Sequence, residues 1–142
     1  MGKDAPPPSG YKRIIMHYTL DVKPNLVRKA RLVAGGHLTD PPDDSVYSGV
    51  VSLCSLCIVT FLAELNGLNL MAADVQNAYL RSKTKEKVYI IANHEFGDLQ
   101  GHTLLIDKAL YGLHTSGACS HDKLFDTLAA EGWKPCFADS DV

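Results

Sequence analysis

Hydrophobic and polar residues alternate along two neighbouring segments near the N-terminus, 13–22 (RIIMHYTLDV) and 26–33. Both segments are rich in β-branched and aromatic residues, which favour β-strands. The sequence Lys-Pro-Asn at 23–25 separates them and is typical of a turn. The pattern therefore predicts a β-hairpin on which Lys29 and Arg31, two residues apart, lie on the same face.

Two later segments show the three- and four-residue spacing of amphipathic helices. The first follows Ser52, a residue type that often caps helices, and ends at Asn-Gly, residues 66–67. The second is predicted over 116–131, with Gly132 ending it. The residues expected to face inward on this second helix are Leu124, Phe125, Leu128 and Ala129.

The segments between and after these helices are short and apolar. Residues 68–75 (LNLMAADV) predict a strand that enters the core, followed by a short turn or helix at 76–80. Residues 87–92 and 103–106 predict two more strands, and residues 136–142 look like the beginning of another. Hairpins combined with packing helices predict an α+β fold with an antiparallel sheet and two packing helices.

Composition limits the possible classes of protein. The 142 residues are 46% hydrophobic and 21% charged, which argues against disorder, collagen and coiled coil. No apolar run approaches the ~18 residues that cross a bilayer, and residues 1–10 resemble a flexible leader without a signal-peptide segment. We therefore expect an intracellular location, cytoplasmic or nuclear, no membrane partner and four reduced cysteines; the oligomeric state is left open.

The net charge of −2 hides a strong asymmetry along the chain. Residues 1–37 carry a net charge of +5, whereas the remainder carries −7. A basic hairpin on an acidic body suggests that a polyanion is held on one side. On charge alone, a solvated hairpin with ordinary surface cations explains the pattern equally well.

Asp74 is the most informative polar residue because it ends the apolar segment 68–75. A buried carboxylate is costly unless it is paired, hydrogen-bonded or bound to a metal. One interpretation is that Asp74 caps the turn at 76–77. The other is that it binds Mg²⁺ in phosphoryl or nucleotidyl transfer, for which several converging carboxylates are needed.

Five blocks follow one another along the chain: RKARLVAGG at 28–36, YSGVVS at 47–52, ADVQNAYL at 73–80, KEKVYI at 85–90 and DKALYGL at 107–113. Together and in this order they resemble the reverse transcriptase of copia-type retrotransposons, an RNA-directed DNA polymerase and nucleotidyltransferase encoded by transposable elements. The resemblance covers 11–142 and implies a right-hand polymerase with a fingers-like part at 11–48 and a partial palm and fingers at 49–142. It also implies nucleic-acid binding, with an RNA or DNA template–primer and a dNTP as partners.

The resemblance assigns a catalytic role to Asp74, which would bind Mg²⁺ with help from the Val75 carbonyl. The backbone N–H groups of Val75, Gln76, Asn77 and Ala78 would face the triphosphate. Tyr79 would lie beneath the sugar and exclude a 2′-hydroxyl by shape; the alternative is an ordinary core aromatic residue.

The resemblance also assigns nucleotide contacts to the hairpin and to a later turn. Lys29 and Arg31 would meet the incoming triphosphate, unless they are plain surface cations. Tyr111 and Gly112 would form a tight turn that supports the nucleotide and the template base. Gly112 would allow close backbone approach there, although an ordinary turn glycine is a comparable interpretation.

Other features of the sequence depart from the family pattern. The reverse transcriptase reaction needs a Tyr-x-Asp-Asp hairpin, which the sequence lacks, and Asp139-Ser140-Asp141 is expected to be a solvated chain end. We therefore expect a truncated domain that binds metal weakly and is inactive alone. The alternative is a non-catalytic nucleic-acid-binding or interaction module from a decayed or domesticated element.

Cysteine and histidine residues give weaker signals. Cys54, Cys57 and Cys119 stand where the resemblance leads us to expect arginine. Cys54 and Cys57 form a CxxC, but their place in the apolar stripe predicts buried thiols that act as small hydrophobic residues rather than metal ligands. His121 is expected to be a surface or packing residue. The run His-Thr-Ser at 114–116 invites a nucleophile interpretation, but no acidic partner is evident.

Overall fold

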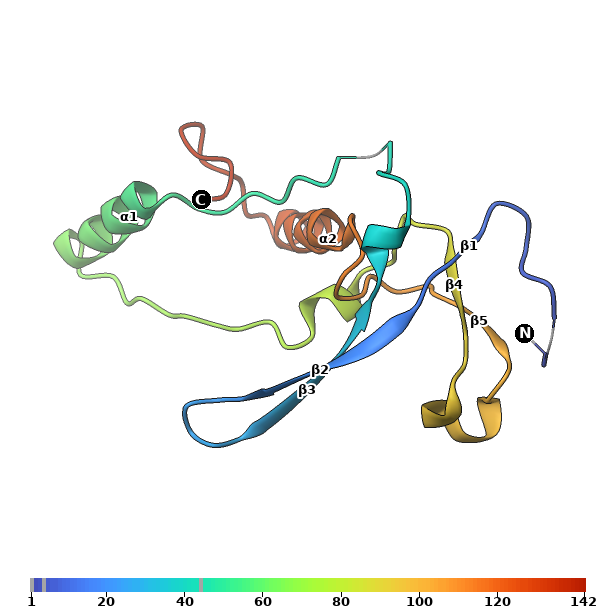
Figure 1. Ribbon diagram of the computed structural model, residues 1–142. Helices are drawn as coiled ribbons and strands as arrows, with labels where there is room; N and C mark the ends of the chain where they lie inside the picture. Colours follow the sequence, from blue (N-terminus) through green and yellow to red (C-terminus); the bar gives the residue numbers. More distant parts are fainter. Residues whose placement is uncertain (1, 4, 44) are drawn as a thin grey trace.

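The computed structural model describes residues 2–3, 5–43 and 45–142. Met1 and Asp4 of the predicted leader, and Asp44, lie outside the described residues. Figure 1 shows a β-hairpin and a small sheet beside α2, with α1 set apart from both at the end of extended connections.

The predicted hairpin is confirmed. Strand β2 (Met16–Val22) pairs antiparallel with β3 (Arg28–Ala34), with Met16 opposite Ala34 and Val22 opposite Arg28. Most of the hairpin projects into solvent (Figure 1), so the side chains of β2 are largely exposed. At its base, the Ala34 N–H donates to the Tyr111 carbonyl at 2.7 Å, which ties the hairpin to the rest of the molecule.

A three-stranded sheet forms beside the hairpin in the order β1-β4-β5. Strand β1 (Lys12–Arg13) runs parallel to β4 (Val88–Ile91), which pairs antiparallel with β5 (Thr103–Leu105). The two predicted strands at 87–92 and 103–106 are thus confirmed, but the sheet is mixed rather than wholly antiparallel. The central core cluster consists of Ile14, Ala34, Val88, Ile90 and Leu113.

Helix α1 (Leu53–Leu65) begins where the sequence predicts. The Ser55 N–H donates to the Ser52 hydroxyl at 3.0 Å, and the helix ends at Asn66 before Gly67. The expectation that its apolar stripe is buried is wrong, because Ala63 is its one buried residue. The physical reason is that, in the part of the chain that the structure describes, neither sheet lies against α1 (Figure 1), so its apolar stripe has no sheet to pack on.

Helix α2 (Ser116–Ala130) is confirmed, and Gly132 follows it with a φ of 89°. Its buried side is wrongly predicted, since Ser116, Ala118 and Cys119 are buried while Leu124, Phe125 and Leu128 are about half exposed and Ala129 is exposed. The N-terminal half of α2 packs against the body of the molecule, including the short 3₁₀ helix η2 (Ala78–Arg81). The C-terminal half extends beyond it.

Two predicted strands are absent. Residues 68–75 are irregular and exposed, and residues 136–142 form turns, closed by a backbone hydrogen bond from Cys136 to Val142. A strand needs a partner for its backbone groups, and in the described part of the chain no strand lies beside either segment. The remaining 3₁₀ helices are η1 (Gly36–Leu38) and η3 (His94–Leu99).

The fold is therefore α+β, as predicted. The predicted leader is attached to the sheet, because Lys3 forms a bridge with His102 and the Thr103 hydroxyl donates to the Ala5 carbonyl at 2.7 Å. Within the described residues, no helix is both long and apolar enough to cross a bilayer.

Candidate functional site

A cavity of about 710 Å³ lies between the hairpin and the segment that follows residue 73. It brings together seven of the residues that the sequence singled out, from three separate parts of the chain. These seven are Lys29, Arg31, Asp74, Val75, Gln76, Asn77 and Tyr111. We call this cavity the hairpin cleft; its other lining residues are Lys23, Ala30, Leu32, Leu80 and Leu110.

Two of the three cations that line the hairpin cleft, Lys29 and Arg31, are positioned by strand geometry; the third, Lys23, lies in the turn before β3. Lys29 and Arg31 alternate with exposed residues along β3, and both are partly buried on the side that faces the cleft. The guanidinium carbon of Arg31 lies 5.9 Å from the centroid of the Tyr111 ring. A cation this close to an aromatic face is attracted by the ring quadrupole, so Tyr111 restrains the Arg31 side chain.

Two tyrosines lie next to these cations: Tyr111 lines the cleft, and Tyr79 packs against Tyr111. The rings of Tyr79 and Tyr111 lie 4.8 Å apart between centroids and are tilted by 55°. Tyr79 belongs to η2, which Asn77 begins in a left-handed conformation with a φ of 52°. The Arg81 side chain closes the turn by donating from Nε to the Gln76 carbonyl at 3.1 Å. Tyr79 and Ala78 therefore lie beside the cleft without lining it.

Gly112 makes the close backbone approach that the sequence suggested. Its φ is 91°, and a Cβ at this position would collide with the Ala34 carbonyl oxygen. A Cβ at Gly36 would likewise collide with the Gly112 carbonyl oxygen. The end of β3 therefore crosses the 111–112 turn at backbone contact, and this crossing holds Arg31 over Tyr111.

Asp74 differs from the expectation in its burial. It is exposed and lies in an irregular segment, and it makes no hydrogen bond or ion pair with the described residues. It does not cap the turn at 76–77 either. Its carboxylate lines the same cleft as Lys29 and Arg31, so the cleft carries charges of both signs.

A magnesium ion can be tested against the donors that are present. Among the described residues, no group of three or more His, Cys, Asp or Glu side chains could enclose a metal. Mg²⁺, however, is often bound by one or two carboxylates together with substrate phosphates and water. Asp74 therefore fits an ion that is shared with a bound polyphosphate and does not fit an all-protein metal cage.

The thiol and hydroxyl candidates are placed differently from the prediction. Cys54 and Cys57 are exposed on α1, whereas Cys119 is buried in α2. Thr115 and Ser116 are buried, and the Thr115 hydroxyl donates to the Glu86 carboxylate at 3.0 Å. The Ser116 hydroxyl donates to the Leu110 carbonyl at 2.7 Å. Both hydroxyls are thus engaged in structural hydrogen bonds, which leaves the nucleophile interpretation without support.

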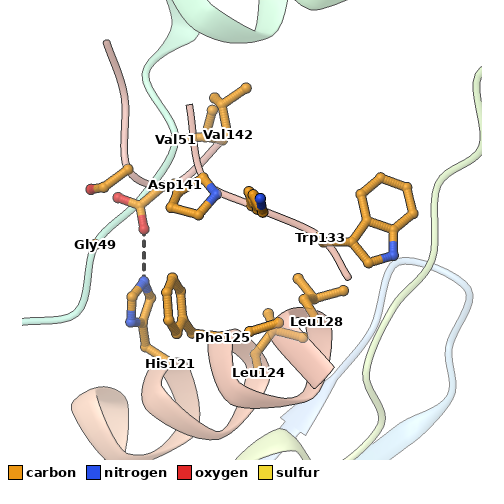
Figure 2. A pocket seen from close by; sticks show the side chains of 13 residues that line it. Gly49, Val51, His121, Leu124, Phe125, Leu128, Trp133, Asp141 and Val142 are labelled. Atoms are coloured by element: carbon orange, nitrogen blue, oxygen red, sulfur yellow. Dashed lines mark hydrogen bonds and ion pairs between the residues drawn. The ribbon is translucent and has the colours of Figure 1, made fainter. Parts of the chain in front are cut away.

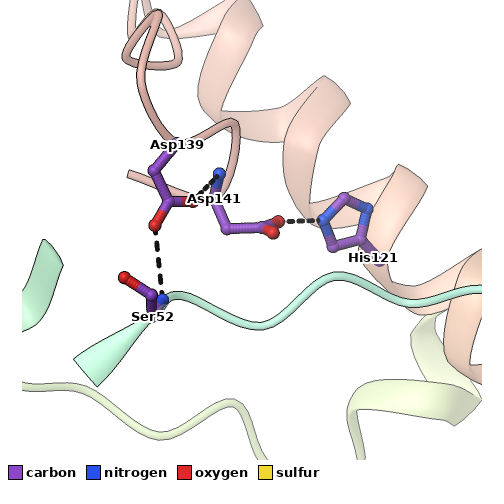
Figure 3. Close-up of polar contacts among 4 residues, drawn as sticks. All are labelled: Ser52, His121, Asp139 and Asp141. Carbon is purple, nitrogen blue, oxygen red and sulfur yellow. Dashed lines mark hydrogen bonds and ion pairs between the residues drawn. The ribbon is translucent and has the colours of Figure 1, made fainter. Parts of the chain in front are cut away.

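The sequence analysis missed a polar cluster at the C-terminal segment (Figure 3). Asp139 accepts hydrogen bonds from the Ser55 hydroxyl at 2.6 Å and from the Ser52 N–H at 3.3 Å. The Asp141 N–H donates to the other Asp139 oxygen at 3.1 Å, and the Asp141 carboxylate lies 2.7 Å from His121 Nε2. The expected solvated chain end is therefore wrong. His121 is partly exposed, as a surface residue is expected to be, and it also pairs with Asp141.

This cluster has an electrostatic consequence. The hydrogen bond from Ser55, followed by those from the Asp141 and Ser52 N–H groups, holds the pKa of Asp139 below its ordinary value of 3.8. A carboxylate at the start of α1 also interacts favourably with the helix dipole. The Ser52-x-x-Ser55 pair was visible in the sequence, but nothing there indicated which distant carboxylate would reach it.

The α+β fold, with a basic hairpin facing a short carboxylate-bearing segment, is compatible with part of a polymerase domain. The chain belongs to the family described as reverse transcriptase (RNA-dependent DNA polymerase), whose model matches residues 6–141. No curated protein and no solved structure matches the chain. Membership of this family implies a nucleic-acid template–primer and nucleotides as partners.

Proposed function

We propose that this chain is the fingers and partial palm of a copia-type retrotransposon reverse transcriptase, and that the hairpin cleft binds an incoming dNTP for RNA-directed DNA synthesis. The observation that carries the proposal is the meeting of Lys29, Arg31, Asp74 and Tyr111 in one cavity. The cavity of about 710 Å³ is large enough for a nucleotide.

The triphosphate is bound by the hairpin. Lys29 and Arg31 supply positive charge from one strand, and charge-assisted hydrogen bonds to phosphate oxygens are about twice as strong as neutral ones. Arg31 presents a planar fork of donors that matches a phosphate, and its stacking on Tyr111 reduces the freedom it loses on binding. Val75, Gln76 and Asn77 also line the cleft, and we assign their backbone N–H groups to the triphosphate.

Asp74 and the Val75 carbonyl would hold Mg²⁺ together with the triphosphate. When bound, the ion activates the attacking primer 3′-hydroxyl and neutralises the charge on the departing pyrophosphate. Asp74 is suited to this role because its exposed carboxylate has no partner among the described residues. The role of the protein is to place this carboxylate in the same cleft as the cations Lys23, Lys29 and Arg31.

Tyr79 would discriminate between deoxyribose and ribose. Its ring is held at a fixed tilt against Tyr111, and η2 restrains its backbone. A rigid aromatic ring beneath the sugar excludes a 2′-hydroxyl by shape. Ala78 and Gly112 serve this arrangement by keeping the backbone close to the nucleotide.

We further propose that the described chain binds nucleotide without polymerising. Two-metal transfer needs several converging carboxylates, and in the described part of the chain only Asp74 provides an acidic group to the hairpin cleft. Primer extension on an RNA template should therefore show no incorporation, whereas any template-directed incorporation would contradict this part of the proposal.

The experiment that tests the proposal is a calorimetric titration of the protein with dTTP in the presence of Mg²⁺. Arg31→Ala should weaken binding by about tenfold or more, because it removes a charge-assisted contact to phosphate. Arg28→Ala is the matched control, since Arg28 is exposed at the start of β3 and does not line the cleft. Equal binding by the two variants would contradict the assignment of the cleft.

A second function is favoured by one observation, the net charge of +5 on residues 1–37. A non-catalytic module would use this charge to bind the nucleic-acid backbone, with an affinity that falls steeply with salt. In that case Asp74→Asn would leave the affinity for an RNA–DNA duplex unchanged, and dTTP would not bind.

A further inference from the structure

A second cavity of about 280 Å³ lies between the C-terminal half of α2 and the segment that follows it (Figure 2). It shares no lining residue with the hairpin cleft. Its apolar wall is formed by Leu124, Phe125, Leu128 and Trp133. These residues are between 43% and 69% exposed, so the cavity is an open groove with an apolar wall on α2 and at Trp133.

One end of this cavity is polar. His121 lies one helical turn before Phe125, and its Nε2 is 2.7 Å from one carboxylate oxygen of Asp141. The second carboxylate oxygen of Asp141 has no hydrogen-bond donor among the described residues. Figure 2 shows the pair at one end of the apolar wall. The cavity therefore offers an acceptor at one end of an aromatic and aliphatic surface.

The polar end is held in place from outside the cavity. Asp141 donates its N–H to Asp139, which in turn accepts hydrogen bonds from Ser52 and Ser55 at the start of α1 (Figure 3). The Asp141 side chain is 15% exposed, and a Cβ at Gly49 would collide with its carboxylate. An acceptor that is fixed before the ligand arrives loses little freedom on binding.

These features define the ligand chemistry. A dry cavity of about 150 Å³ lined by aliphatic and aromatic residues is known to bind benzene, so about 280 Å³ accommodates a substituted ring. Aromatic walls favour a planar ring. The lining carries one carboxylate, Asp141, and one ammonium group, Lys134, whose charges cancel, which favours a neutral ligand.

We propose that this cavity is a binding site for a small neutral aromatic molecule with one hydroxyl group, of the phenol class. The ring packs against Phe125 and Trp133, and the hydroxyl donates to the free oxygen of Asp141. The site is independent of nucleotide binding in the hairpin cleft.

Trp133 makes the test direct, because it is the only tryptophan in the sequence and lines the cavity. The chain is titrated with p-cresol and, separately, with toluene, which has the same ring without the hydroxyl, while Trp133 fluorescence is recorded. We expect a saturable change for both probes and about tenfold tighter binding of p-cresol, because its hydroxyl bonds to a charged acceptor. Equal affinities for the two probes would overturn the proposal.

Two α2 variants provide the control. Ala129 lines the cavity and is exposed, so Ala129→Leu fills the space without disturbing the core and should abolish the fluorescence change. Ala130→Leu is the matched control on the same helix, does not line the cavity, and should bind p-cresol like the unmodified chain. A saturable change that survives in Ala129→Leu, or no saturable change in the unmodified chain, would overturn the proposal. Neither result depends on whether dTTP binds.

Discussion

The guanidinium carbon of Arg31 lies 5.9 Å from the centroid of the Tyr111 ring, and Tyr111 in turn contacts the ring of Tyr79. This contact links the hairpin to the turn at 111–112 and to η2, three segments that are distant in sequence. Each of the three residues has a proposed nucleotide contact. Their mutual packing therefore makes the side of the hairpin cleft a single unit.

Tyr111→Leu should weaken dTTP binding by about two- to fivefold, because it removes a cation–π contact worth roughly 0.5–1 kcal/mol. It should also reduce the preference for dTTP over UTP, since Tyr79 loses the ring that fixes its tilt. Calorimetry with both nucleotides measures each effect. Tyr111→Phe keeps the ring and should retain both properties; a loss of both in the Phe variant would show that the hydroxyl group matters instead.

Gly112→Ala should lower the free energy of unfolding by at least 2 kcal/mol. The left-handed conformation alone costs a non-glycine residue about 1–2 kcal/mol, and the added methyl group would also collide with the Ala34 carbonyl. Urea denaturation followed by circular dichroism measures the change. Gly132→Ala is the control, because Gly132 has a nearly identical φ of 89° but open space around it. Equal losses in the two variants would contradict the backbone crossing.

Ser52→Ala should destabilise α1 by about 1 kcal/mol, because it removes the hydroxyl that accepts the Ser55 N–H. Hydrogen exchange at the first turn of α1 should become faster. Ser9→Ala, at an exposed position outside any helix or strand, should have no effect. Unchanged protection in Ser52→Ala would mean that Asp139 alone is sufficient to cap the helix.

The stability that the hydrogen bonds of Asp139 with Ser52, Ser55 and Asp141 contribute should depend on pH. The pKa of Asp139 is lowered in the folded state, so its contribution to stability is present above the ordinary value of 3.8 and is lost as the pH falls through the folded pKa. The difference in melting temperature between the unmodified chain and Asp139→Asn should therefore be largest near neutral pH and shrink below about pH 4. A difference in melting temperature that does not change with pH would contradict this role of Asp139.

Asp74→Asn should leave the fold unchanged, because the shape of the side chain is conserved and Asp74 has no partner among the described residues. It should remove the Mg²⁺ dependence of dTTP binding, because the amide lacks the charge that binds the ion. Titration with and without Mg²⁺ measures this, and circular dichroism confirms the fold. Persistent Mg²⁺ dependence in the variant would show that Asp74 is not the ligand.

Local features of the sequence were sufficient to predict several elements. The hairpin, the Ser52 cap, the end of α1 at Asn66 and the two strands β4 and β5 depend on turn residues, caps and alternation between neighbours. Each of these signals acts over a few residues, so the surrounding structure does not change it.

Predictions about burial were less successful, because burial depends on what lies opposite a segment. Three apolar segments were predicted to be buried in the core from their composition, yet all are exposed. They are the stripe of α1, the face of α2 at Leu124 and Phe125, and the segment 68–75. In the described chain, no sheet or helix covers them. An apolar pattern shows that a surface can be buried, but only the arrangement of the other elements shows whether it is.

The sequence by itself determined the hairpin with Lys29 and Arg31 on one face, the two helices and the resemblance to a polymerase family, because these follow from short-range periodicity and ordered blocks of residues. The tertiary structure alone decided that Asp74 shares a cleft with those cations and that Asp141 pairs with His121. In both cases the groups are far apart in sequence, so the distance between them in space depends on the path of the chain. That path is set by the backbone crossing of Ala34 with Gly112 and by the return of the C-terminal segment past α2.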